Sequence, residues 1–451
     1  MMNILALLQC IQPLISKTDL RRFSRIVQAM VSMTGRVTML GISRWAGKGG
    51  SYRSIQRFFN AAIPWPQVFV KFFEQHLCQP AGTYFLVGDE SVVTKSGKQT
   101  HGLDYFFSGL LKKTVKSIAI FSLALVSVED RRSYPLQVEQ VVRTEAEKAA
   151  AKAKQKKKPA RQKSVPKKKP GRPKGSQNRD KTQVELVPEL LRIQEMIKKQ
   201  LVCLPARIKI RYLALDGHFG NNNALQMARQ CGLQLISKLR HDAALHFVYA
   251  GKQKRKGPRR RYGQQINYRR IPKQYRIAQS TQGNIRTCIY QAVMLHHEFA
   301  QPLNVVIIVK THLKTGACAN VNLFSSDLEL CYETIIDYYS LRFQIEFNFR
   351  DAKQFWGLED FMNVNEIPLN NALNLALFMV DVSQALLRDL RQTFPESSVL
   401  DLKAYFRAAK YFEETIKMLP QKPEPILLQQ IFGQVSALGC IHPVNVQFPP
   451  P

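Results

Sequence analysis

The spacing of apolar and polar residues divides the chain into helical ends and a strand-rich middle. Residues 1–78 repeat apolar side chains at helical intervals. Further helices are predicted at 185–200, 221–230, 332–356, 369–392 and 400–419. Apolar or alternating runs predict strands at 84–91, 118–128, 134–142, 208–216, 232–240, 266–271, 275–279, 287–295, 305–310 and 321–325. This order predicts an α/β fold with a mixed sheet and flanking helices, between helical N- and C-terminal regions.

The predicted helix 332–356, which contains no Gly or Pro, places four polar side chains on one face. At about 100° per residue, Tyr339, Arg342, Glu346 and Lys353 fall within about 60° of arc. An ordinary amphipathic helix with an Arg–Glu pair at i,i+4 explains part of this pattern. A carboxylate flanked by Arg, Lys and Tyr also suits a site that handles phosphate and metal together.

Two aspartates end predicted strands. Asp89 follows the apolar run from Tyr84, and Asp216 ends the run 208–216 before a glycine turn and a helix. Taken singly, such residues are turn or helix-capping aspartates. The order of strand, Asp216, turn, helix and strand is also the one by which an α/β sheet places a ligand site at a strand's carboxyl end.

The charge of the chain indicates a polyanionic partner, with nucleic acid first. The 451 residues carry a formal net charge of +33, while 45% hydrophobic content allows two or three domains with a large core. The eight cysteines form no Cys-x2-Cys pair, so reduced thiols in a cytoplasmic protein are expected. No run reaches the roughly 18 apolar residues of a membrane span, so we expect a soluble protein without membrane contact.

Two basic segments are candidate DNA contacts. Residues 143–181 hold 16 Lys or Arg and three Asp or Glu, which predicts a disordered basic linker. Within it, Arg172 and Lys174 in Lys-Pro-Gly-Arg-Pro-Lys-Gly belong to either an AT-hook for a narrow A·T minor groove or a generic polycation. Arg53 and Arg57 lie on a helix after a glycine turn, either a helix-turn-helix or a common helical hairpin.

The spacing Tyr339-x2-Arg342-x3-Glu346-x6-Lys353 resembles the signature of DDE transposases of insertion-sequence family four. The following Trp-Gly-Leu-Glu-Asp-Phe is similar to that family, as are the segment after Asp89 and the surroundings of Asp216. The resemblance implies an RNase H-like core interrupted by a β-rich insertion. Some members hold a flipped base on a tryptophan of that insertion; here the insertion has none, so stacking would fall to Phe247, Tyr249, Tyr262, Tyr268, Tyr275 or Tyr290.

The resemblance also implies roles. Asp89, Asp216 and Glu346 would be the catalytic carboxylates and would hold two Mg(II) or Mn(II) ions, while Tyr339, Arg342 and Lys353 would hold the DNA end. The implied protein is a prokaryotic, nucleoid-associated transposase. It would cleave the ends of its insertion sequence by metal-dependent hydrolysis and join the 3′ ends to target DNA, as a homodimer on double-stranded DNA. The alternatives are an inactive DNA-binding protein derived from a transposase and a structure-specific nuclease.

The expected domain organisation follows from the pattern and the resemblance together. It comprises a helical region for binding DNA ends (1–78), three core parts (79–142, 182–240 and 304–360), the basic linker (143–181), the β-rich insertion (241–303) and a helical C-terminal region (361–451).

Overall fold

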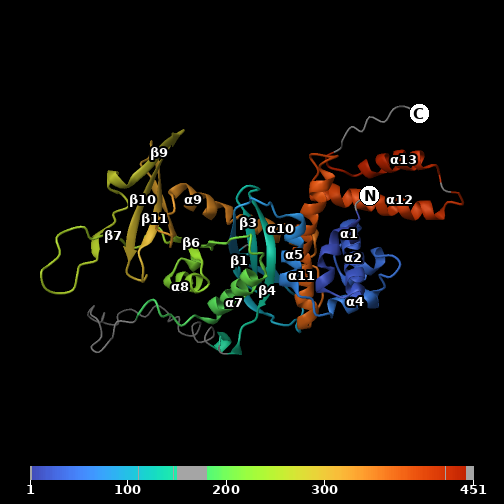
Figure 1. Cartoon of the computed structure of the whole chain (residues 1–451), viewed down its shortest axis with the longest axis horizontal. Helices are drawn as coiled ribbons and strands as arrows, with labels where there is room; N and C mark the ends of the chain where they lie inside the picture. The colour runs from blue at the N-terminus through green and yellow to red at the C-terminus, as the bar shows by residue number, and fades with distance from the viewer. Residues whose placement is uncertain (1–2, 110, 146, 150–179, 422, 443–451) are drawn as a thin grey trace.

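The computed structural model describes residues 3–109, 111–145, 147–149, 180–421 and 423–442. The molecule is elongated: a sheet runs from one end to the middle, and a helical body occupies the other end (Figure 1). The linker residues Arg172 and Lys174 lie outside the described residues. No helix in the described ranges is long and apolar enough to span a membrane.

The centre of the molecule is one mixed sheet, with twelve strands in the part of the chain described. In its first half β1 (Tyr84–Thr94) pairs antiparallel with β3 (Lys113–Ser127), which also pairs with β2 (Asp104–Ser108) and β4 (Arg132–Val141). On its other edge β1 pairs parallel with β5 (Tyr212–Ala214), and β5 pairs parallel with β6 (Gln234–Leu239). The predicted mixed α/β architecture is therefore confirmed.

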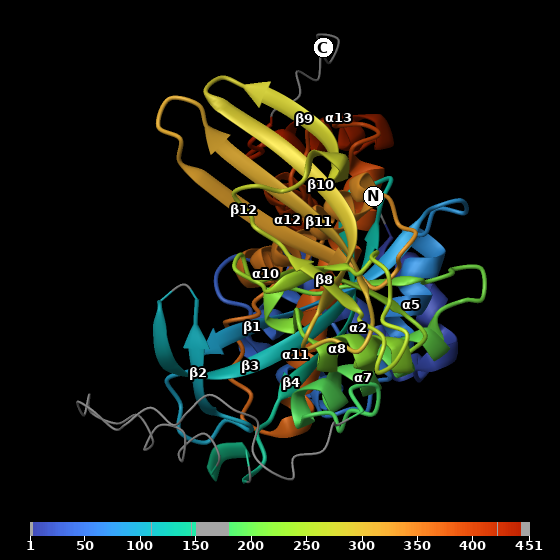
Figure 2. The ribbon, with the colours of Figure 1, turned by 90° about the vertical axis from the view of Figure 1, so that its left-hand side faces the viewer.

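The predicted insertion extends this sheet and does not form a separate one. Strand β6 pairs with β12, and the order continues through β11, β10, β7 and β8, with β9 on the other part of β10. The bounds are β7 (Leu245–Val248), β8 (Tyr262–Gln265), β9 (Arg276–Gln282), β10 (Ile285–His296), β11 (Leu303–His312) and β12 (Cys318–Ser325). Strands β9 to β12 lie side by side as a ribbon at the end of the sheet (Figure 2).

Two strand predictions in this half are inaccurate. Residues 266–271 form turns, because Tyr268 uses its hydroxyl to hold the loop to the carbonyl of Ala243 at 2.7 Å and Pro272 follows. The run 208–216 forms a strand only at Tyr212–Ala214. Between the strands lie α7 (Pro188–Cys203), η2 (Gly217–Phe219), α8 (Asn222–Gln230) and η3 (Lys273–Tyr275).

The N-terminal region is helical, as predicted, and packs with the C-terminal region into one helical body. It comprises α1 (Ile4–Leu8), η1 (Gln9–Leu14), α2 (Lys17–Ser32), α3 (Met39–Trp45), α4 (Tyr52–Phe59) and α5 (Trp65–His76). The C-terminal region comprises α11 (Glu366–Leu390), α12 (Val399–Met418) and α13 (Pro425–Ala437). Helix α12 packs on α2, and α11 packs on α4 and α5.

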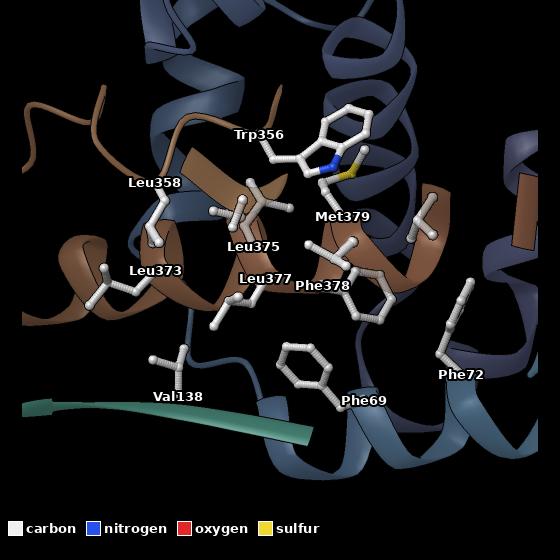
Figure 3. Packing of buried hydrophobic residues seen from close by; sticks show 14 of the residues in the cluster. Phe69, Phe72, Val138, Trp356, Leu358, Leu373, Leu375, Leu377, Phe378 and Met379 are labelled. Carbon is white, nitrogen blue, oxygen red and sulfur yellow. The ribbon is translucent and has the colours of Figure 1, made fainter. Parts of the chain in front are cut away.

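Helix α11 joins this body to the sheet. Every residue from Asn371 to Ser383 is buried, which is typical of a helix enclosed on all sides. Phe378 lies against Phe69 and Phe72 of α5, while Leu377 faces β4 near Val138 (Figure 3). One hydrophobic core therefore runs from the N-terminal helices through α11 to the sheet.

An acid lies inside this apolar helix. Asp381 is completely buried, and neither of its carboxylate oxygens has a hydrogen-bond partner in the described part of the chain. Burial raises the pKa of Asp381 well above its ordinary value of 3.8. The side chain is therefore held in its neutral form, and the folded protein must bear the cost of keeping it protonated.

Replacing this acid by its neutral isostere should stabilise the protein. The folded-state pKa is raised, so Asp381 contributes most favourably below the unfolded value and progressively less as pH rises above it. Each pH unit between the unfolded and folded pKa costs about 1.4 kcal/mol. Urea unfolding at several pH values should show Asp381→Asn gaining stability over the parent from about pH 4 upward. Equal stability of the two proteins at pH 5 and pH 8 would contradict a buried neutral acid.

Candidate active site

Asp89 lies in β1 at the edge where the buried run Tyr84–Val87 reaches the surface. Its Oδ1 accepts a hydrogen bond from the backbone N–H of Glu90 at 2.9 Å. Successive side chains of a strand point to opposite faces, so Asp89 and Glu90 lie on different faces of the sheet. Glu90 lines a cavity of about 350 Å³ together with Glu189 and His218. Asp89 instead faces the helices that follow the sheet.

Asp216 is brought to the same edge by strand register. Strand β5 is parallel to β1 and pairs Ala214 with Val87, so Asp216 and Asp89 each follow a paired residue by two positions. Asp216 begins the 3-10 helix η2, and its Oδ1 accepts from the backbone N–H of His218 at 3.1 Å. Adjacent parallel strands deliver both acids to one edge, as in other α/β sheets.

Glu346 approaches from the helical side. The predicted continuous helix 332–356 is wrong: the structure has α9 (Tyr332–Leu341) and α10 (Gln344–Phe355), separated at Arg342 and Phe343. Three i→i−3 bonds tighten the turn. They run from Phe343 N–H to the Ser340 carbonyl (3.1 Å), from Ile345 N–H to the Arg342 carbonyl (3.3 Å) and from Glu346 N–H to the Phe343 carbonyl (3.0 Å). The two halves pack on different surfaces. Helix α9 packs on β6, β11 and β12, whereas α10 packs on β1, β4 and α11.

Arg342, at this turn, connects the helix to the first acid. Its Nη1 lies 3.5 Å from Asp89 Oδ2, with the Arg342 side chain 11% exposed. Its guanidinium carbon lies 5.6 Å from the ring centre of Tyr339, so these two predicted residues are neighbours. Arg342 Nε is buried without a hydrogen-bond partner in the described chain. An additional acceptor, such as a phosphate oxygen, would satisfy this group.

The electrostatics join the three acids through Asp89. Burial raises the pKa of Asp89; the Arg342 guanidinium opposes that rise, and the charge of Asp216 adds to it. Burial also raises the pKa of Glu346, and the charge of Asp89 raises it further. The charge of Arg342 again lowers it. Each acid of this set therefore interacts with Asp89, as expected for groups that share one site.

Lys353 is placed differently from its three companions. Its Nζ donates to the backbone carbonyl of Val92 at 3.2 Å and forms an ion pair with Glu359 at 3.3 Å. These contacts fasten the C-terminal half of α10 to β1, three residues beyond Asp89. In this arrangement the Lys353 charge is already partnered, whereas that of Arg342 is shared only with an acid of the site.

The three acids match a hard divalent cation in donor type. Carboxylate oxygens are the protein ligands that Mg²⁺ prefers; burial, and after it the charge of Asp216, raises the pKa of Asp89, and a bound cation would favour its ionised form. Among the residues described, no three carboxylate, imidazole or thiol groups are gathered closely enough to hold a metal ion. The donor chemistry therefore fits, and Arg342 now supplies the positive charge beside Asp89.

The other predicted DNA contacts lie away from these acids. Arg53 and Arg57 are exposed on α4, whereas Ile55 and Phe58 of the same helix are buried, so the basic and apolar faces separate as predicted. In the insertion, Tyr275 stacks on Phe247 with ring centres 4.5 Å apart. Such aromatic residues already have partners within the chain.

Two residues that position Asp216 escaped sequence analysis. Ser237, fully buried on β6, donates its hydroxyl to the backbone carbonyl of Asp216 at 2.7 Å. Gly220, after η2, lies so close to β6 that a Cβ would overlap the carbonyl oxygen of Lys238. A serine within a strand gives no sequence signal of such a role. The glycines of Gly217–Gly220 predict a turn, but they do not predict that the turn packs against β6.

Comparison with protein families places these features in one class. The model of the DDE superfamily endonucleases matches residues 7–302, which include Asp89 and Asp216; Glu346 lies beyond the matched range. The chain belongs to this superfamily. It is therefore related to nucleases of the transposase type, whose substrate is DNA and which generally use divalent metals. A comparison with curated proteins gives no match.

The turn after Asp216 offers a direct test of how the site is positioned. Gly220→Ala should force β6 and η2 apart and destabilise the protein by about 1–3 kcal/mol, the usual cost of overpacking. Gly217→Ala is the matched control, because its Cβ would lie 3.6 Å from the same carbonyl oxygen, an ordinary contact. Urea unfolding should separate the two variants, and equal stability would show that the turn does not hold Asp216 tightly.

Proposed function

We propose that this protein is the transposase of an insertion sequence of family four. It binds the ends of its element, cleaves them by metal-dependent phosphodiester hydrolysis and joins the 3′ ends to target DNA. The observation that carries the proposal is the ion pair of Arg342 with Asp89 at 3.5 Å; in addition, the charge of Asp216 raises the pKa of Asp89, and that of Asp89 raises the pKa of Glu346, after burial in both cases. An ordinary amphipathic helix gives no reason for its Arg and Glu to converge on a strand-end acid.

The order of the central strands supports an RNase H-like core. Strands β4, β3 and β1 are antiparallel neighbours, and β5 and β6 continue beyond β1 in parallel. A three-stranded meander followed by two parallel strands is the arrangement that the resemblance implies. In such a core the first two acids would come from two adjacent central strands; here Asp89 is on β1 and Asp216 follows β5 by two residues.

In this function Asp89, Asp216 and Glu346 would hold two divalent ions. Such ions activate the attacking hydroxyl and stabilise the leaving oxygen of a phosphodiester. Arg342 would bind a phosphate oxygen through its planar guanidinium, with its unpartnered Nε as one donor. Tyr339 would support that guanidinium from the side. Lys353 would act mainly by holding α10 against β1.

Positive charge outside the site would bind the rest of the DNA. Arg53 and Arg57 on the exposed face of α4 would contact the element's end, and Arg172 and Lys174 would add contacts from the basic linker. We infer a homodimer in the DNA complex, because two element ends must be processed together. These contacts would affect cleavage of the two element ends only by changing how tightly the DNA is bound.

Removing any one metal-binding charge should abolish cleavage. Asp89→Asn, Asp216→Asn and Glu346→Gln should each reduce cleavage of the element's end by more than about 100-fold. That exceeds the usual effect of residues that merely support metal ligands. The measurement is a gel assay with end DNA and Mg²⁺; Asp337→Asn, an acid of α9 paired with Arg131, is the control. If the unsubstituted chain binds DNA but does not cleave it, the inactive DNA-binding alternative is correct.

The geometry of Arg342 should matter beyond its charge. Arg342→Lys keeps a cation but loses the planar fork, so at least one charge-assisted hydrogen bond to phosphate is lost. At about 1.5 kcal/mol for such a bond, single-turnover cleavage at saturating protein should slow about tenfold. Lys417→Ala, on the surface of α12, should cleave at the parental rate. If Arg342→Lys cleaves at the parental rate, Arg342 does not bind the phosphate in the way proposed.

A further inference from the structure

A second group of arginines lines a cleft that begins beside the Glu346 face of α10, at Arg350, and continues around the helix to its far side. The cleft has a volume of about 490 Å³ and lies between the outer face of α10, the beginning of β4, the end of α11 and the beginning of α12. Arg132, Arg350 and Arg391 line it, with Asp351 as its one lining carboxylate. Asp351 is already paired with Arg350 at 2.9 Å.

Arg132 and Arg391 face the cleft without a counter-ion. In the described part of the chain, neither forms an ion pair with a carboxylate within 4 Å. Arg391 donates Nε to the Ser397 carbonyl at 2.9 Å, which leaves its terminal nitrogens toward the cleft. Burial lowers the pKa of Arg391, and the neighbouring charge of Arg132 lowers it further against the weaker opposing effect of Glu396. Two like charges are thus held near each other.

The remaining walls of the cleft also favour an anion. Ser398, Val399 and Leu400 begin α12 at its edge, where first-turn amides lack partners within the helix and the helix dipole is positive. Asp401, which closes the capping box, is 3% exposed and already accepts from Ser398 and His442. The sequence after His442 contains no Asp or Glu that would supply a counter-ion.

Helix α10 connects this cleft to the acids without interruption. At about 100° per residue, Arg350 projects about 40° from Glu346, and Phe347 about 100° from it. All three are exposed, and the Arg350 guanidinium lies 4.6 Å from the Phe347 ring centre. A long polyanion lying on the exposed face of α10 would therefore pass from the acids to the cleft.

We propose that the cleft between α10, α11 and α12 binds the phosphate backbone of the DNA duplex, through Arg132 and Arg391, on the side of α10 opposite the cleavage site. This rests on the proposed function for the identity of the polyanion. Arg132 and Arg391 would each contact a phosphate without reading sequence, and they would fix how the duplex lies across α10. The C-terminal helices thereby acquire a function in DNA binding.

The test measures how DNA binding depends on salt. The probe is a fluorescein-labelled linear duplex, titrated by anisotropy at several NaCl concentrations without divalent ions. Each phosphate contact contributes about 0.9 to the slope of log K against log salt, so Arg132→Gln/Arg391→Gln should lower the slope by about two. Arg229→Gln, an exposed arginine of α8, removes equal charge per residue elsewhere and should leave the slope unchanged.

A parental slope in the double variant would overturn the proposal, as would an equal loss in Arg229→Gln. Because Arg391 also holds the Ser397 carbonyl, unfolding midpoints are measured for each variant. If the double variant fails to fold, Arg132→Gln alone should still lower the slope by about one, because Arg132 is exposed and its side chain has no hydrogen bond to any residue that the structure describes. Failure of the proposed function would appear separately, as absence of Mg²⁺-dependent cleavage by the unsubstituted chain.

Discussion

The burial of α11 is the constraint on which the rest of the structure depends. This helix has no solvent-facing side from Asn371 to Ser383, so it is stable only while the N-terminal helices, β4, α10 and α12 enclose it. Phe378 alone lies within 5.0–5.4 Å, ring centre to ring centre, of Phe23, Phe69 and Phe72. Losing such a ring from a packed core costs about 3–5 kcal/mol, a large share of the 5–15 kcal/mol by which domains are stable.

The same packing positions the helix that carries Glu346. Helix α10 lies against α11 on one side and against β1 and β4 on the other, while Trp356 at its end is buried in the same core. The relative placement of Glu346 and Asp89 is therefore set by a common core, to which both α10 and β1 are fixed. The acids themselves repel one another, so this fixation, together with the charge of Arg342, must hold them near each other.

Sequence patterns predicted the parts of this arrangement that depend on local periodicity. The runs ending near Asp89 and Asp216 form β1 and β5, and the helices at both ends of the chain exist. The break at Arg342 could not be predicted, because the sequence contains no Gly or Pro there and the cause is tertiary: two halves packed on different surfaces. Likewise, Ser237 and Gly220 matter only through strands that are distant in sequence, and the burial of Asp381 follows from enclosure that a single helix cannot reveal.

The basic side chains differ in whether a carboxylate of the protein already neutralises their charge. Near the acids, Lys353 is bonded to Val92 and paired with Glu359, so Arg342 is the cation of the Tyr339–Lys353 set that remains available for a phosphate. One such contact is too weak to bind a duplex, because phosphate contacts weaken as the salt concentration rises. In the proposed function, DNA binding would therefore come from charges that are not needed to balance acids. Arg53 and Arg57 on α4, Arg132 at the beginning of β4 and Arg391 at the end of α11 meet this condition. In the proposed function, the groups that cut DNA would therefore be separate from those that hold it, and α10 and α11 would fix the position of one set relative to the other.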